Sequence, residues 1–90
     1  YPAEIENLML AHPAIHSVAV IGVPDERLGE VGMAFVVLAD GMTATAEELF
    51  AWSRDHMANY KAPRRVQFLD ALPLNATGKV MKDELRVRAG

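Results

Sequence analysis

The sequence predicts an α+β fold, in which a small, mostly antiparallel three-stranded sheet, with or without an extra hairpin, packs with two to three helices. β-Branched and apolar residues fill strand-length runs at residues 15–23 and 31–38, and the short loop between them favours an antiparallel pair. A shorter apolar run at residues 65–69 supplies the third strand. Apolar residues at helical spacing occupy residues 3–11 and 45–58, and a short helix is expected at the C-terminus.

Two of the predicted helices begin at recognisable signals. Pro2 suits the first turn of a helix, and Glu4 and Glu6 place negative charge near the positive end of the helix dipole. Thr45 and Glu48 form a Thr-x-x-Glu capping box, which is typical of a helix N-terminus. Both starts agree with the apolar spacing that follows them.

The composition is that of one globular domain. Its 90 residues are 51% hydrophobic and 23% charged, and the net charge of −3 gives no electrostatic footprint for nucleic acid. The absence of cysteine excludes disulfides and thiolate metal sites. No apolar run is long enough to predict a membrane span, and no signal-peptide pattern opens the sequence, so we expect a cytoplasmic protein.

Several polar and aromatic side chains are better accounted for by structure than by chemistry. Asp25 follows Pro24 in a turn, where a carboxylate commonly accepts hydrogen bonds from its own backbone. Trp52 lies at helical spacing, which predicts core packing rather than stacking on a base. The histidines show no convincing ligand spacing, so we predict no metal site; they are His12, His16 and His56.

Residues 72–86 carry the strongest chemical signal. Pro73 and Gly78 favour an ordered loop, because proline fixes its own φ and glycine accepts a left-handed backbone. We expect a helix from Met81, which places Lys79 where the loop passes into the helix. A mobile cation beside a glycine suits a phosphate or carboxylate ligand.

The Gly78-Lys79 pair is also half of a Walker phosphate loop. That motif needs glycine where this chain has Pro73, and Ser or Thr where it has Val80. A Walker loop is therefore excluded. The alternative to a ligand-binding role is that Lys79 is a solvated surface lysine at the start of a helix.

A basic cluster follows the second predicted helix. Tyr60 beside Lys61 and Arg64 can stack on an adenine ring and bind phosphates. Equally, Tyr60 can pack at the end of the helix while the cations complement the helix dipole. Arg54 lies on the polar side of that helix, and a solvated surface arginine accounts for it at least as well as a role in binding a ligand.

Four blocks of residues occur in the order and spacing of one enzyme family. They are Tyr1-Pro2-Ala3-Glu4-Ile5-Glu6, then Val23-Pro24-Asp25 with Leu28-Gly29-Glu30, then Tyr60-Lys61-Ala62-Pro63-Arg64, then Leu72-Pro73 with Thr77-Gly78-Lys79. Over essentially all 90 residues the chain resembles the small C-terminal domain of adenylate-forming (AMP-binding) enzymes: acyl-CoA synthetases, adenylation domains of peptide synthetases, and luciferases. The family's last block, Pro-x4-Gly-Lys followed by a basic residue and Leu-Arg, is matched by Pro73, Gly78, Lys79, Lys82, Leu85 and Arg86.

The resemblance implies that residues 1–90 are a single mobile C-terminal domain of an acyl-CoA synthetase, most like a fatty-acid-CoA ligase. A large N-terminal domain and a hinge are then expected outside this chain, and ATP, Mg²⁺ and CoA bind mainly with that N-terminal domain. Lys79 would stabilise the transition state of adenylation, with Thr77 and Gly78 in the adenylation loop. Rotation of the domain would then bring another face to the CoA channel. The residues implied on the CoA side are Arg54, Tyr60, Lys61 and Arg64.

Two further functions are compatible with the sequence. One is an adenylation domain that loads a carrier protein, which we favour less because the sequence ends just after its last helix. The other is a non-catalytic α+β binding or regulatory module. The isolated 90 residues are expected to be inactive in every case. Lys79 on an accessible loop is also an expected target of a lysine acetyltransferase, since acetylation would remove its charge.

Overall fold

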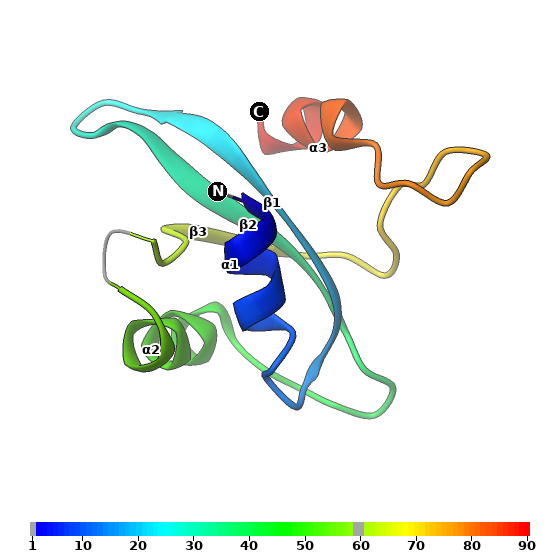
Figure 1. Cartoon of the computed structure of the whole chain (residues 1–90), viewed down its shortest axis with the longest axis horizontal. Helices are drawn as coiled ribbons and strands as arrows, with labels where there is room; N and C mark the ends of the chain where they lie inside the picture. Colours follow the sequence, from blue (N-terminus) through cyan, green and yellow to red (C-terminus); the bar gives the residue numbers. More distant parts are fainter. Residues whose placement is uncertain (1, 59–60) are drawn as a thin grey trace.

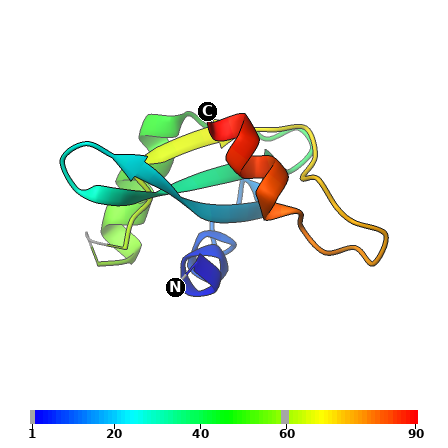
Figure 2. The same ribbon diagram turned by 90° about the horizontal axis from the view of Figure 1, so that it is seen from above.

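The computed structural model describes residues 2–58 and 61–90, and it confirms the predicted α+β fold. Its elements are α1 (Pro2–Met9), β1 (Ile15–Asp25), β2 (Gly29–Leu38), α2 (Ala46–His56), β3 (Arg65–Phe68) and α3 (Lys82–Ala89). The strands form one sheet in the order β1-β2-β3 (Figure 1). Seen along the sheet, α1 and α3 lie on opposite faces (Figure 2).

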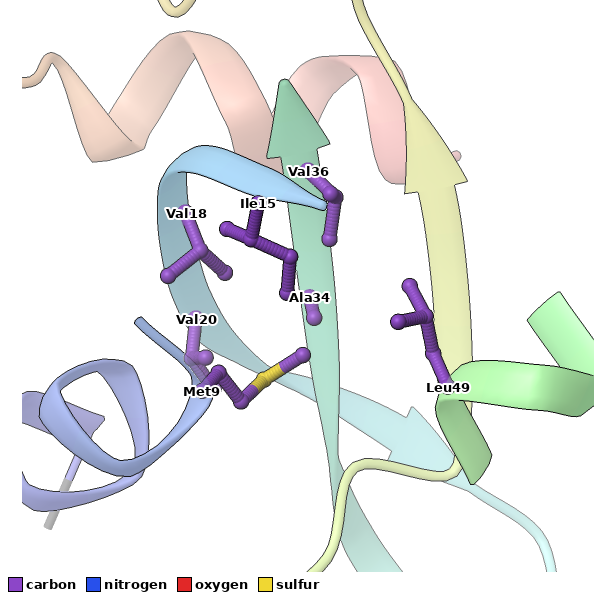
Figure 3. Packing of buried hydrophobic residues seen from close by; sticks show 7 residues of the cluster. All are labelled: Met9, Ile15, Val18, Val20, Ala34, Val36 and Leu49. Carbon is purple, nitrogen blue, oxygen red and sulfur yellow. The ribbon is translucent and has the colours of Figure 1, made fainter. Parts of the chain in front are cut away.

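Both faces of the β1–β2 pair are buried. Side chains alternate along a strand, so Val18, Val20, Ala34 and Val36 face one way, where Met9 of α1 and Leu49 of α2 cover them (Figure 3). The alternate set packs on the other face with Leu85 of α3; it comprises Ala19, Ile21, Val23, Val31, Met33 and Phe35. Burial on two faces explains why these strands are continuous apolar runs in the sequence.

The β1–β2 hairpin is longer than the predicted strands, because residues 24–30 were expected to be a turn. Pro24 pairs with Glu30 and Asp25 with Gly29, which leaves a connection of only residues 26–28. Gly29 has a φ of +82°, the left-handed conformation typical of the residue that closes a three-residue hairpin loop. Pro24 is tolerated because β1 lies at the edge of the sheet.

Asp25 stabilises this turn, as predicted. Its Oδ1 accepts hydrogen bonds from the backbone N–H groups of Leu28 and Arg27, both at 2.9 Å. These two bonds, the Leu28 bond foremost, lower the pKa of the Asp25 carboxyl below its ordinary value. The carboxylate therefore acts through the turn and not as a free acid or base.

The third strand is parallel to its neighbour, which the sequence did not indicate. Met33 to Val36 of β2 pair in the same direction with Arg65 to Phe68 of β3, whereas β1 and β2 are antiparallel. A parallel pair needs a long crossover connection, and the segment containing α2 provides it. The sheet is thus mixed, with its longer pairing antiparallel.

The helix boundaries differ slightly from the predicted ones. α1 ends at Met9, two residues early, whereas the predicted cap of α2 is confirmed because Thr45 Oγ1 accepts from the N–H of Glu48 at 3.1 Å. Trp52 is half-buried outside the two apolar clusters, with its ring stacked 4.0 Å from that of His56 and edge-on to His12. None of the described helices is long and apolar enough to cross a membrane.

Replacing Asp25 tests the turn. Because the folded-state pKa of Asp25 is lowered, its contribution to stability is present above about pH 4 and is lost as the pH falls through the folded-state pKa. We therefore expect Asp25→Ala to lower the free energy of unfolding near neutral pH and to approach wild type in acid. Urea denaturation followed by Trp52 fluorescence measures this, with the exposed neighbour Glu26→Ala as control. A pH-independent difference would contradict it.

Replacing Leu85 tests the attachment of α3. Leu85 is 0% exposed in the cluster beneath the helix, so Leu85→Ala should lower the free energy of unfolding by about 2–5 kcal/mol through lost burial and the cavity left behind. Val87→Ala is the matched control on the same helix, since Val87 is 81% exposed, and should change stability by at most about 0.5 kcal/mol. Equal effects of the two substitutions would show that α3 is not packed as described.

Candidate functional site

The Lys79 loop, defined here as residues 73–81 between β3 and α3, projects away from the sheet (Figure 1). At its base Leu74 and Val80 form an isolated antiparallel bridge, and the N–H of Met81 donates to the carbonyl of Pro73 at 2.8 Å. The extra hairpin allowed for in the sequence is therefore this single bridge. Val80 also packs against the Leu85 cluster, which fixes the base of the loop to the core.

The tip of the Lys79 loop is held by Asn75. Its Oδ1 accepts hydrogen bonds from the Thr77 N–H at 2.9 Å, the Thr77 hydroxyl at 2.7 Å and the Lys79 N–H at 2.9 Å. Its backbone completes the ring: the Asn75 N–H donates to the Lys79 carbonyl, and the Asn75 carbonyl accepts from the Gly78 N–H. Gly78 has a φ of +84°, so a residue with a side chain would be strained there.

Lys79 itself is exposed on this ordered loop. Within residues 2–58 and 61–90, the ion pairs involve other cations, and no carboxylate pairs with its ammonium. Its predicted place, where the loop passes into a helix expected from Met81, agrees with the structure to within one residue, because Met81 is the N-cap and α3 begins at Lys82. The bridge at Val80 and the bond from Met81 to Pro73 hold those residues outside the helix.

A second basic site lies between α2 and β3. Arg54 and Arg64 line a depression of about 200 Å³, together with Phe50, Ala62 and Pro63, and none of these lining residues is acidic. The Arg64 N–H donates to the carbonyl of Gly32 at 2.9 Å, which ties this segment to β2. The structure thus brings together two of the arginines that the sequence marked out.

The other two residues expected on the CoA side are Lys61 and Tyr60, and only Lys61 is among the described residues. Lys61 pairs with Glu4 of α1, and this hydrogen bond and charge lower the pKa of the Glu4 carboxyl. Lys61 therefore ties the segment before β3 to α1. It also lines a neighbouring depression of about 300 Å³ with Arg64. Tyr60 lies outside the described residues.

The two basic sites are at opposite ends of the molecule. In both views the Lys79 loop projects at one end, whereas α2 and the segment leading to β3 lie at the other (Figures 1 and 2). The fold therefore does not bring Lys79 together with Arg54 and Arg64. The domain thus displays Lys79 at one end and the arginine pair at the other.

Two residues help to hold the Lys79 loop in place, and this role was not predicted from the sequence. Asn75 was one, although an Asn before Thr and Gly is a known signal for a side chain that bonds its own loop. Glu6 was the other: its Oε2 accepts from the Val20 N–H at 2.7 Å and from Lys82 Nζ at 3.0 Å. No local pattern signals the Glu6 contacts, because its partners are remote in sequence.

Comparison with known proteins identifies the family. Residues 4–79 match the family described as the AMP-binding enzyme C-terminal domain. A feruloyl-CoA synthase from Amycolatopsis sp is 51% identical over 90 residues, 100% of this chain and 18% of that protein. A crotonobetaine/carnitine-CoA ligase from Proteus mirabilis is 49% identical over 83 residues, 92% of this chain and 16% of that protein.

The same relationship holds in three dimensions. The structure of the amide bond synthetase McbA from Marinactinospora thermotolerans matches with a TM-score of 0.91 and 39% identity, over 98% of this chain and 18% of that one. The chain thus spans less than a fifth of the length of these relatives. By sequence and by fold, the chain belongs to the AMP-binding enzyme C-terminal domain family and is most like the acyl-CoA synthetases within it.

Proposed function

We propose that this chain is the mobile C-terminal domain of an acyl-CoA synthetase, which activates a carboxylic acid with ATP and then transfers the acyl group to CoA. The observation that carries this proposal is the Lys79 loop, whose backbone is held by its own hydrogen bonds while the Lys79 ammonium is exposed and pairs with no described carboxylate. A large N-terminal domain outside this chain would supply the rest of the active site, in keeping with the small share of each relative that the chain covers.

Lys79 would act in the first half-reaction. Attack of a carboxylate on the α-phosphate of ATP gathers negative charge between two anions and releases pyrophosphate, and a positioned ammonium stabilises that charge. Because the loop is ordered beforehand, little reorganisation is needed at the moment of reaction. A Cβ at Gly78 would meet nothing within 4 Å, so the backbone beside Lys79 is open to a ligand. Mg²⁺ would arrive with the ATP phosphates.

Arg54 and Arg64 would act in the second half-reaction. Guanidinium groups bind phosphates with paired, charge-assisted hydrogen bonds, so this depression suits the nucleotide end of CoA. Lys61, in the adjoining depression, would extend the same surface. Tyr60 remains an expected member of the CoA side through the resemblance alone. Because the two basic sites lie at opposite ends of the domain, a rotation between half-reactions would exchange one for the other at the active-site cleft.

The acceptor and the control of the reaction are further parts of the proposal. CoA is favoured because the feruloyl-CoA synthase and the carnitine-CoA ligase are close relatives, whereas the amide bond synthetase is a more distant one. We place the activity in the cytoplasm. Acetylation of Lys79 by a lysine acetyltransferase would remove its charge and stop adenylation.

Removing the Lys79 ammonium tests the first half-reaction. In the full-length enzyme that contains this chain, Lys79→Ala should slow ATP–pyrophosphate exchange by on the order of 10²–10³-fold, the usual effect of losing one preorganised transition-state contact. Thioester formation from supplied acyl-adenylate should be spared. Arg88→Ala, at an exposed position on α3, is the control and should leave both rates unchanged. Equal loss of both half-reactions in Lys79→Ala would refute the assignment.

Removing the arginine pair tests the second half-reaction. The double substitution Arg54→Ala and Arg64→Ala should raise the KM for CoA by roughly 10–100-fold, because charge-assisted hydrogen bonds to phosphate are lost. ATP–pyrophosphate exchange should stay at the wild-type rate, the mirror image of Lys79→Ala. Steady-state kinetics with CoA and with pantetheine, which lacks the nucleotide, separate the contacts: pantetheine kinetics should not change. An unchanged KM for CoA would place the nucleotide elsewhere.

A further inference from the structure

We propose that Asn75 is a positioning residue for adenylation, whose side-chain oxygen holds the Lys79 loop in the conformation that presents the Lys79 ammonium. The inference rests on the proposed function of Lys79, and it assigns a role to a residue that the chemistry itself does not require. Asn75 would act through Lys79 and would touch neither ATP nor the acid.

Three hydrogen bonds converge on one atom of Asn75. Its Oδ1 accepts from the N–H of Thr77, from the Thr77 hydroxyl and from the N–H of Lys79, at 2.9, 2.7 and 2.9 Å. The two backbone donors lie on either side of Gly78, so one oxygen spans the residue whose φ is +84°. The orientation of the Lys79 backbone, and hence the root of its side chain, is therefore set by Asn75.

The identity of the side chain follows from these contacts. A serine or alanine at position 75 cannot place an acceptor at the same point, because the first is shorter and the second has no polar atom. An aspartate would supply the oxygen but would add a negative charge to the loop that carries Lys79, weakening the positive potential that the proposed site needs. Asparagine provides the acceptor without the charge.

The contacts of Asn75 serve the loop and not the core. Asn75, Thr77 and Lys79 are all exposed, and their mutual bonds join residues of the same loop. The packing that attaches the loop to the domain comes instead from Leu72 and Val80, which lie against the Leu85 cluster. Removing the Asn75 side chain should therefore loosen the tip while the domain stays folded.

A loosened tip predicts a specific kinetic change. Without Oδ1, the N–H groups of Thr77 and Lys79 bond to water, and the loop samples other conformations. The adenylation rate falls by the fraction of time that Lys79 spends out of place, and small misplacements of a catalytic group are known to be costly. The loss belongs in kcat, since Lys79 acts on charge that develops in the transition state.

The test compares Asn75→Ala with Asn7→Ala in the full-length enzyme. Asn7 is an exposed asparagine on α1, far in sequence from the loop, and is the matched control. We expect Asn75→Ala to lower kcat for ATP–pyrophosphate exchange by about 10–100-fold, with the KM for ATP, the thioester half-reaction and the melting temperature unchanged. A kcat within about twofold of wild type, or equal loss of both half-reactions with a lower melting temperature, would overturn the proposal.

Hydrogen exchange tests the structural step directly. The backbone amides of Thr77 and Lys79 should exchange faster in Asn75→Ala, whereas Asn75→Asp, which keeps an acceptor oxygen, should retain their protection. Unchanged exchange in Asn75→Ala would also overturn the proposal. Lys79→Ala, assayed in parallel, separates the two ideas. If Lys79→Ala retains ATP–pyrophosphate exchange, the proposed function fails. If Lys79→Ala abolishes this activity and Asn75→Ala leaves it unchanged, only the role of Asn75 fails.

Discussion

The rest of the structure depends on the burial of both faces of the β1–β2 hairpin. Val20 and Ala34 on one face, and Ile21 and Phe35 on the other, are all at most 2% exposed, so neither face can be left to solvent. With α1 and α2 on one side, the chain after β3 must supply α3 to the other. The segment that makes this passage carries Lys79. The position of the site is thus a consequence of how the sheet is covered.

The contact between Glu6 and Lys82 joins the layers that this covering creates. The Glu6 carboxylate on α1 accepts from the β1 backbone at Val20 and from the Lys82 ammonium at the start of α3. Both side chains are largely shielded, at 20% and 34% exposure, so the pair is less screened than an ordinary surface ion pair. Because Lys82 follows Lys79 by three residues, the same contact fixes one end of the loop. The loop is therefore held at its base by the domain and at its tip by Asn75.

Local signals predicted what local chemistry decides. The cap at Thr45 and the turn bonds of Asp25 depend on residues within three positions, and both are present. The direction of β3 and the partner of Lys82 depend on distant segments, and no pattern in the sequence reveals them. Pro24 is typical of a turn because proline has no backbone N–H to donate to a neighbouring strand. It is tolerated in β1 because β1 is an edge strand, with a partner on one side only. Lys79 was marked out by its neighbours in the sequence and its role by the family resemblance, whereas its supporting bonds required the structure.

The rigidity of the core also bears on how the domain would work. Phe35 and Val36 of the central strand are fully buried and belong to the two opposite clusters, so the sheet cannot easily deform to bring the Lys79 loop toward Arg54 and Arg64. If both sites serve one active-site cleft, the whole domain must turn. In that case the parts that move would be the connection to the proposed N-terminal domain and the Lys79 side chain, while the loop backbone stays ordered. On the proposed mechanism, Asn75 would matter because the Lys79 loop would have to return to the cleft in the same conformation in each catalytic cycle.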